Sequence, residues 1–314
     1  MLDSDQIQSR VTRSTLRRFG LKGARRRDSG GDGFLVPILV VLIVVLAVPF
    51  TQSIYYSFTN YDGMRPHPDF VGFRNYVAVF RDPALAASLW FTVLYAVSTT
   101  VITTLLAIPL ALALNRAFFG RNVARAVFFF PAIPSTAILG FVWAVILSPL
   151  SRGALNALLH WFNAGPIPWL SNSQLAQVSV IVVGVWTTTG WHALLYLAYL
   201  QSIPADYYEV ATLDGANGLQ KFLHITLPLL TPAVTVSTLL LLVGGMNVYA
   251  LPMAMTKGGP GFATFTITQS IITQGISQGK YGQAAAVSIV FMMIVATLVL
   301  AQVYVSSRVG GDSR

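Results

Sequence analysis

The residue types that usually perform chemistry in proteins are sparse in this sequence. It contains no cysteine, and its four histidines, His67, His160, His192 and His224, are far apart along the chain. The absence of cysteine excludes a disulfide framework and a thiol nucleophile. Scattered histidines lack the close spacing of metal ligands. The sequence therefore predicts no catalytic residue set and no metal site.

The acidic residues do cluster once, in the segment 201–225. Asp206, Glu209 and Asp214 stand there with a single lysine. Pro204 is expected to end the preceding helix. Asp206 followed by Glu209 three residues later has the spacing of a capping box, which predicts the start of a short helix.

Two glycines and two prolines bound this short helix on its far side. Gly215 and Gly218 are expected to break it, and a second helix should begin near residue 219. Pro228 and Pro232 then mark entry into an apolar segment. The pattern predicts a short acidic helix lying across one end of a helical bundle.

The elements that position this loop are expected to span a membrane. The chain is 54% hydrophobic and 10% charged, with a mean hydropathy of +0.65, whereas soluble domains carry about a quarter charged residues. Six windows free of Asp, Glu, Lys and Arg are long enough to cross a bilayer, which requires about 20 residues. We expect an all-α integral membrane protein with helices over 34–58, 88–114, 124–147, 176–200, 226–251 and 283–306.

Basic residues set the expected orientation. Eight of the 20 lie in the first 33 positions, and placing the N-terminus inside puts 14 of the 20 on the cytoplasmic side. Both termini are therefore expected in the cytoplasm, with a basic tail over 1–33, a membrane domain over 34–306 and a short tail over 307–314. The first tail can be a solvated orientation signal or a contact for anionic headgroups. The first apolar segment is longer than the core of a signal peptide and should remain as a helix.

The acidic loop carries a family resemblance. The run Glu209-Val210-Ala211-x-x-Asp214-Gly215-Ala216, followed by Phe222, Ile225, Leu227-Pro228 and Pro232, resembles the EAA loop of binding-protein-dependent ABC importer permeases. Only Val210 departs, where that family usually has alanine. Residues 71–76, 131–143, 258–260, Gly282 and 284–286 are similar to the carbohydrate-uptake branch, in particular to the larger maltose-type permease subunit. The similarity covers about residues 34–306.

The resemblance implies the type I permease fold and a coupling role for the loop 203–222. In that reading the loop is seated on a separate ATP-binding subunit: Glu209 makes an ionic contact, Asp214 orders the loop and Gly215 permits the turn, with Ala211 and Ala216 completing the motif. The implied partners are a second permease subunit, two copies of the ATP-binding subunit and an extracytoplasmic solute-binding protein. No nucleic acid is expected as a partner.

The chain itself has no phosphate-binding loop. Its nearest approach to the Gly-x-x-x-x-Gly-Lys-Ser/Thr pattern, residues 275–281, is one residue short and ends in Tyr281. We therefore expect no cofactor on this chain, with ATP and Mg²⁺ bound by the partner ATPase. The chain is predicted to be a transport subunit of the bacterial cytoplasmic membrane and not an enzyme.

A solute pathway is expected between the fourth and fifth helices. Aromatic faces, hydroxyls and amides suit a neutral solute rich in hydroxyl groups. Distances from the loop, matched to the maltose-type permease, select Trp186, Thr188, Trp191, Gly245, Asn247 and Tyr249. These residues can equally form interface belts or close helix contacts.

The predicted function is inward passage of a sugar or related neutral solute. Two alternatives stay open: an ABC permease for a non-sugar solute such as glycerol phosphate, and a stand-alone secondary carrier. A secondary carrier usually places ionisable residues within its spans, and this sequence offers only His192 there, with His224 at the cytoplasmic edge. The segment 252–282 is expected to be either a re-entrant element or a plain loop.

Overall fold

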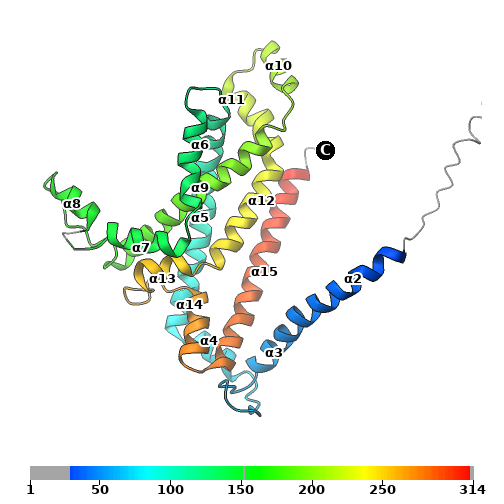
Figure 1. Ribbon diagram of the computed structural model, residues 1–314, viewed down its shortest axis with the longest axis vertical. Coiled ribbons are helices and arrows are strands. Elements are labelled where there is room, and N and C mark those ends of the chain that lie inside the picture. The colour runs from blue at the N-terminus through cyan, green and yellow to red at the C-terminus, as the bar shows by residue number, and fades with distance from the viewer. Residues whose placement is uncertain (1–28, 151–152, 312–314) are drawn as a thin grey trace, which may run out of the picture. The chain divides into compact units, whose positions relative to one another are not determined.

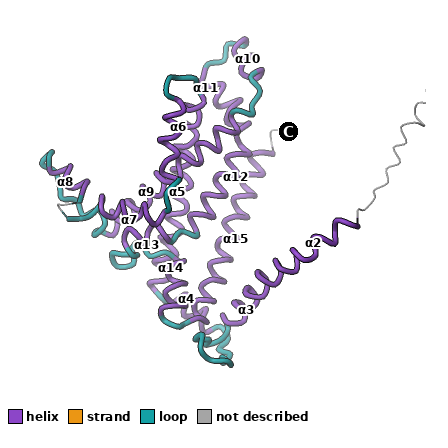
Figure 2. The backbone as a smooth tube through the Cα atoms, in the orientation of Figure 1, coloured by secondary structure: helices purple, strands orange, loops and turns teal. Residues whose placement is uncertain are grey.

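The computed structural model describes residues 29–150 and 153–311, and within these ranges the backbone is helical apart from loops and turns (Figure 2). The only pairing of strand type there is an isolated bridge between Thr59 and Phe70. Most of the predicted basic tail, up to residue 28, and residues 312–314 lie outside the described part. The proposed division into tails and membrane domain stays a prediction.

Residues up to Thr51 and residues from Gln52 onward form two compact units, and the boundary between them falls within the first span. Three consecutive helical segments make it up: α2 (Ser29–Leu42), the π-helical turn η1 (Ile43–Ala47) and α3 (Val48–Ser57). Val36–Ser57 has a mean hydropathy of 2.4 and is long enough to cross a bilayer. The predicted helix over 34–58 is confirmed.

The second unit contains the remaining helices. They are α4 (Arg74–Arg81), α5 (Pro83–Asn115), α6 (Arg121–Phe129), η2 (Phe130–Ala132), α7 (Thr136–Ile146), α8 (Ala154–His160), α9 (Ser173–Leu200), α10 (Asp206–Leu213), α11 (Gly218–Lys221), η3 (Phe222–Thr226), α12 (Leu227–Met246), α13 (Ala250–Thr256), α14 (Ile267–Ile272), η4 (Thr273–Ser277) and α15 (Tyr281–Gly311).

Long helices α5, α9 and α12 pack against one another, and α15 packs against α12 (Figure 1). In the most apolar window of α9, 56% of the residues are buried, against 22% in α15. α9 therefore lies at the centre of the packing, and α15 presents most of its surface outward, as expected of a helix facing lipid. A cluster that includes Ala111, Tyr196 and Leu230 joins the three central helices.

Side chains at the helix starts explain where two central spans begin. The Asp82 carboxylate accepts a hydrogen bond from the Ala84 amide, and Pro83 occupies the first helical position of α5. The Asn172 side chain accepts from the amides of Gln174 and Leu175 at the start of α9. Both caps satisfy backbone donors that an apolar environment would leave unpaired.

The predicted single helix over 124–147 is wrong. The structure has α6 with η2, then α7, and the two parts meet at 93°. Pro131 and Pro134 stand at the bend; proline removes a backbone donor and clashes with the preceding turn, so a straight helix cannot pass through both positions.

The predicted helix over 226–251 is wrong at its end. The helix runs from Gly218 to Met246 and stops at Asn247. The chain then turns into α13, which packs against α7 and α9. The segment 252–282, expected to be re-entrant or a plain loop, contains the end of α13 together with α14 and η4. It is therefore not a plain loop.

Five helices of the described residues are long and apolar enough to cross a membrane, or six if the bent pair counts as one span. The predicted all-α, six-span membrane fold is confirmed at this level. The cytoplasmic placement of both termini stays a prediction.

Candidate functional site

The acidic loop forms two short helices, α10 and α11, at one end of α9 and α12. Figure 1 shows them opposite the end that carries α4 and α14. The predicted coupling residues Glu209 and Ala211 lie on α10, and Asp214, Gly215 and Ala216 lie in the turn that follows. The structure thus brings all five together in one exposed element.

The predicted capping box at Asp206 is wrong. α10 begins at Asp206 itself, with Ala205 as its cap residue and no side-chain cap. Asp206 is therefore within the first turn, where a carboxylate is favourable to the helix dipole. The capping box lies instead at α11: the Asn217 side chain accepts from the Gln220 amide (2.9 Å), and the Gln220 side chain accepts from the Asn217 amide (2.8 Å).

Gly215 makes the turn between the two helices. Its φ is +77°, in the left-handed region that glycine adopts without strain. The Ala216 amide donates to the Ala211 carbonyl at 2.9 Å, and the Gly215 amide donates to the Thr212 carbonyl at 3.1 Å. These two bonds form a Schellman motif. The alanines of the sequence motif are thereby joined through their backbones.

The surface of the loop mixes free charge with exposed apolar groups. No described residue forms a hydrogen bond or an ion pair with the Glu209 or Asp214 carboxylate, and both side chains are exposed. Beside them, Val210 is 58% and Leu213 is 88% exposed. An exposed surface that combines apolar and unpaired charged groups is typical of a protein-binding site.

Hydrogen bonds tie α10 to the start of the membrane helix that follows. The hydroxyl groups of Tyr208 and Thr226 lie 3.0 Å apart, and the Lys221 ammonium donates to the Thr212 hydroxyl at 2.8 Å. Thr226 is buried. Two hydrogen bonds therefore connect α10 to α11 and to η3, which lies at the start of the membrane helix that continues as α12.

A second feature is a cavity of about 430 Å³ between α5, α9 and α12. It is lined by Tyr95, Thr99, Thr136, Thr187, Thr188, His192, Leu240, Leu241, Gly244, Gly245, Asn247, Val248, Tyr249, Ala250 and Leu251. None of these side chains is an acid, a lysine or an arginine. The polar part of the wall consists of hydroxyl, amide and imidazole groups.

Several of its polar groups are already paired with protein partners. The Thr188 hydroxyl donates to the Gly184 carbonyl at 2.9 Å and lies 3.1 Å from the hydroxyl of Thr103. His192 Nδ1 lies 2.7 Å from the Ser237 hydroxyl. Such pairing is required in an apolar medium, and hydroxyl oxygens retain further acceptor capacity for a solute.

The structure divides the predicted pathway residues into two sets. Thr188, Gly245, Asn247 and Tyr249 line the cavity. Trp186 and Trp191 do not: they are 40% and 41% exposed, and their rings make edge contacts with Trp143 and His192 respectively.

Sequence reasoning did not select several other lining residues for the solute pathway, among them Tyr95, Thr99 and His192. The available signal was helical spacing. Tyr95 and Thr99 are four residues apart, as are Thr188 and His192, and each pair therefore shares one helix face.

The two adjacent glycines of α12 have different roles. A Cβ built on Gly245 would lie 2.7 Å from Ala96 Cα on α5, whereas one built on Gly244 would meet nothing within 4 Å. Gly245 therefore allows α5 and α12 to approach closely, and Gly244 leaves space open at the cavity. The sequence alone did not separate these two uses of glycine.

The described residues contain no group of three His, Cys, Asp or Glu side chains that could hold a metal ion. An all-helical membrane protein with an exposed acidic loop at one end and an uncharged cavity between its spans has the architecture of a permease subunit. The chain belongs to the family of binding-protein-dependent transport system inner membrane components, whose model matches residues 84–310. It is therefore a multi-pass inner-membrane transport component of an ABC importer and not an enzyme.

Several relatives are permeases named for carbohydrates. The chain is 32% identical over 276 residues to the probable starch degradation products transport system permease protein AmyD of Thermoanaerobacterium thermosulfurigenes, covering 88% of this chain and 93% of that protein. It is 33% identical to the trehalose/maltose transport system permease protein MalF of Thermococcus litoralis, covering 83% and 88% respectively.

The fold also matches a solved transporter. A bacterial ABC transporter involved in the import of the acidic polysaccharide alginate contains a chain that superposes with a TM-score of 0.79, at 22% sequence identity, covering 90% of this chain and 96% of that one. At this identity the likeness concerns the fold. It agrees with the type I permease architecture expected from the loop motif.

Proposed function

We propose that this chain passes a sugar or a related neutral solute inward across the membrane, driven by ATP-binding subunits that dock on the loop of α10 and α11. The observation that carries the solute class is the cavity wall, which offers hydroxyl, amide and aromatic groups and no described acid, lysine or arginine. A neutral polyhydroxylated solute is recognised by such groups, whereas a phosphorylated one requires cations. The names of the relatives support the same class.

The proposed assembly contains a second permease subunit, two copies of an ATP-binding subunit and an extracytoplasmic solute-binding protein. ATP and Mg²⁺ would be held by the ATP-binding subunits. The free carboxylates of Glu209 and Asp214 and the exposed Leu213 support docking, because a partner that presents cations around an apolar cleft would complement them. In this assembly the loop faces the cytoplasm and both termini lie inside.

The proposed mechanism is alternating access. Closure of the ATP-binding subunits displaces α10, and the hydrogen bond between the Tyr208 and Thr226 hydroxyls passes the displacement to η3 and through it to α12. Since α12 carries one wall of the cavity, its movement changes the access of solute from one side to the other. Net transport requires that the two states bind the solute differently.

Uptake into vesicles tests this proposal. The transporter purified with its accompanying subunits, and supplied with its binding protein, is reconstituted and offered labelled neutral oligosaccharide or labelled glycerol phosphate. We expect ATP-dependent uptake of the neutral sugar. Uptake of glycerol phosphate but not of the sugar would contradict the proposed solute class. Uptake driven by an ion gradient without ATP would favour the alternative function of a stand-alone secondary carrier.

A further inference from the structure

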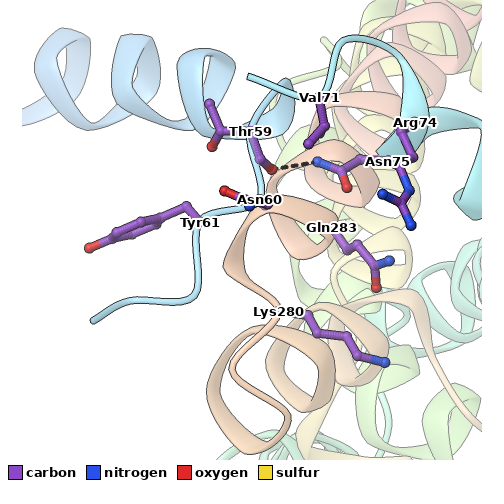
Figure 3. A pocket seen from close by; sticks show the side chains of 9 residues that line it. Thr59, Asn60, Tyr61, Val71, Arg74, Asn75, Lys280 and Gln283 are labelled. Carbon is purple, nitrogen blue, oxygen red and sulfur yellow. Dashed lines mark hydrogen bonds between the residues drawn. The ribbon is translucent and has the colours of Figure 1, made fainter. Parts of the chain in front are cut away.

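A cationic pocket lies at the end of the bundle opposite α10 and α11. It has a volume of about 260 Å³ and lies between the loop after α3, the start of α4 and the start of α15. Figure 3 shows the Arg74 guanidinium, the Gln283 carboxamide and the Lys280 ammonium along one side of this pocket, whereas Tyr61 points away from them.

The framework of the pocket is fixed by buried contacts. Asn75 is buried, and its side chain donates to the carbonyls of Ser57 (2.9 Å) and Thr59 (2.8 Å). The Gly282 amide donates to the Tyr61 carbonyl at 3.0 Å, and a Cβ on Gly282 would clash with the Thr59 carbonyl. The pocket is therefore held by close backbone packing.

The cations of this region have no acidic partner among the described residues, where the one ion pair joins Arg65 and Asp62. Arg74 and Lys280 line the first pocket, and a second of about 350 Å³ shares Lys280 and adds Arg81. Asp82 also lines the second pocket, but its carboxylate accepts the capping bond from Ala84. Three cations and one carboxylate thus line these two adjoining pockets, which leaves two positive charges without a counter-charge.

An apolar groove adjoins the second pocket. Val79 and Leu85 line both the second pocket and a groove of about 120 Å³ between α4, α5, α14 and α15. The groove is lined only by apolar side chains, among them Leu89, Val290 and Phe291. A pocket lined by charged side chains therefore lies next to an apolar groove.

The helix α4 has the amphipathic pattern of an interfacial helix. Phe73, Val77 and Phe80, at helical spacing, are 69%, 46% and 76% exposed. Arg74 and Arg81 bound the same helix. Aromatic and aliphatic groups on one face with arginines beside them are typical of a helix lying at the membrane surface.

We propose that the adjoining pockets and groove bind one anionic phospholipid, with its phosphate between Arg74, Lys280 and Arg81 and a short stretch of one acyl chain in the groove. Phosphate takes up charge-assisted hydrogen bonds from arginine and lysine. A soluble anion or an acidic side chain of another protein would use the cations but leave the apolar groove empty. The membrane location of the chain supplies the phospholipid directly.

The headgroup chemistry favours phosphatidylglycerol. Gln274 lines the second pocket, and its Oε1 is buried without a hydrogen-bond partner among the described residues. Gln283 lines both pockets. Two carboxamides beside a phosphate site can bond the free hydroxyls of a glycerol headgroup, which a choline headgroup lacks.

Lipid titration of the purified transporter tests this assignment. The chain with its accompanying subunits is stripped of lipid in detergent and titrated with phosphatidylglycerol, phosphatidylcholine or inorganic phosphate, and bound molecules are counted by native mass spectrometry. We expect preferential binding of phosphatidylglycerol. The double variant Arg74→Gln/Lys280→Gln should bind it roughly 30-fold more weakly, since each surface cation contributes about one factor of five.

A groove variant tests the acyl-chain site separately from the charges. Val290→Phe should weaken phosphatidylglycerol binding while leaving the cations in place. Two matched controls lie outside all three pockets: Lys257→Gln removes an exposed cation, and Val303→Phe enlarges an exposed side chain of α15. Both should bind the lipid as the parent protein does. Thermal unfolding of each variant shows whether it remains folded.

The proposal is overturned if the parent protein binds phosphatidylglycerol no better than phosphatidylcholine, or if the double variant binds it equally well. It is also overturned if inorganic phosphate binds and phosphatidylglycerol does not, which would indicate a soluble anion. If another subunit covers the groove and the transporter therefore binds no lipid, the proposal is overturned as well. If phosphatidylglycerol binds the Val290→Phe variant as well as it binds the parent protein, the placement of the acyl chain in the groove is contradicted.

Discussion

The α10–α11 loop and the cavity between the central helices satisfy their polar groups in opposite ways. In the loop the Glu209 and Asp214 carboxylates are exposed and have no described partner. In the cavity Thr188 and His192 are each paired with a protein hydroxyl. The loop thus presents unpaired acidic groups at its surface, which suits the proposed protein contact, whereas the cavity presents uncharged groups, which suits the proposed path of a solute that must leave again.

The loop and the cavity also differ in how their functional residues are distributed. Glu209 is the only glutamate in the sequence, and it stands on an exposed helix that is hydrogen-bonded to the start of a membrane span. The cavity spreads its polar groups over α5, α7, α9 and the turn after α12, with no dominant residue. Substitutions should therefore have large, localised effects in the loop and small, distributed effects in the cavity.

The largest expected effect is that of Glu209→Ala. Removing one member of a desolvated charge pair at an interface costs about 2–5 kcal/mol, so docking of the ATP-binding subunit should weaken at least tenfold and uptake should fall accordingly. Co-purification and uptake by vesicles measure the two. Asp206→Ala is the control, because it removes an exposed carboxylate of the same helix that is outside the motif. If both substitutions reduce docking and uptake equally, the effect arises from the negative charge of the helix in general and not from Glu209 in particular.

The next effect concerns the turn. Gly215→Val forces a β-branched residue into the left-handed region at φ +77°, which costs about 1–3 kcal/mol, and uptake should fall severalfold with insertion unchanged. Gly215→Pro should act in the same direction. Gly218→Ala is the matched control, since a Cβ there meets nothing within 4 Å and its φ is not positive. A tolerated valine at 215 would show that the turn geometry is unimportant.

A smaller effect is expected from substituting the two adjacent glycines of α12, one of which packs against α5 while the other borders the cavity. Gly245→Ala places a methyl group 2.7 Å from Ala96 Cα and should destabilise the protein by about 1–3 kcal/mol, measured as a lower unfolding temperature in detergent. Gly244→Ala should unfold as the parent does. If instead both variants unfold normally, the close approach of α5 and α12 is not needed for stability.

The smallest effect is expected within the cavity. Thr188→Val removes one hydroxyl that can bond a solute, which is worth about 1 kcal/mol, so the KM for uptake should rise about fivefold. Trp186→Leu should leave KM unchanged, because Trp186 lies outside the cavity and contacts Trp143. Equal KM shifts in the two variants would contradict the assignment of the solute path.

Hydropathy was sufficient to locate the spans because an apolar run of bilayer length has few other structural solutions. It could not locate the bend at Pro131 and Pro134 or the stop at Asn247, since both lie within apolar sequence. These breaks depend on local backbone chemistry and on the packing of α13 against α7. Composition alone does not encode that packing.

The two sites differed in how much the sequence revealed. The loop motif is contiguous, so its five residues could be placed together in advance, although the capping box was assigned to Asp206 and belongs to Asn217. The cavity draws on helices that are distant in sequence, and its membership depends on the rotation of each helix. Trp186 and Thr188 are two residues apart and face different surroundings for this reason.

Site-specific cross-linking tests the central claim, that the α10–α11 loop is the docking site of an ATP-binding subunit. The chain has no cysteine, so Leu213→Cys introduces a unique thiol on the loop, and Met64→Cys introduces one at an exposed position of the opposite end. A reagent with one thiol-reactive end and one photoreactive end, applied to native membranes and followed by mass identification, should join the Leu213→Cys chain, but not the Met64→Cys chain, to a protein with a phosphate-binding loop. Cross-linking of that protein from Met64→Cys alone, or from neither position, would contradict the account.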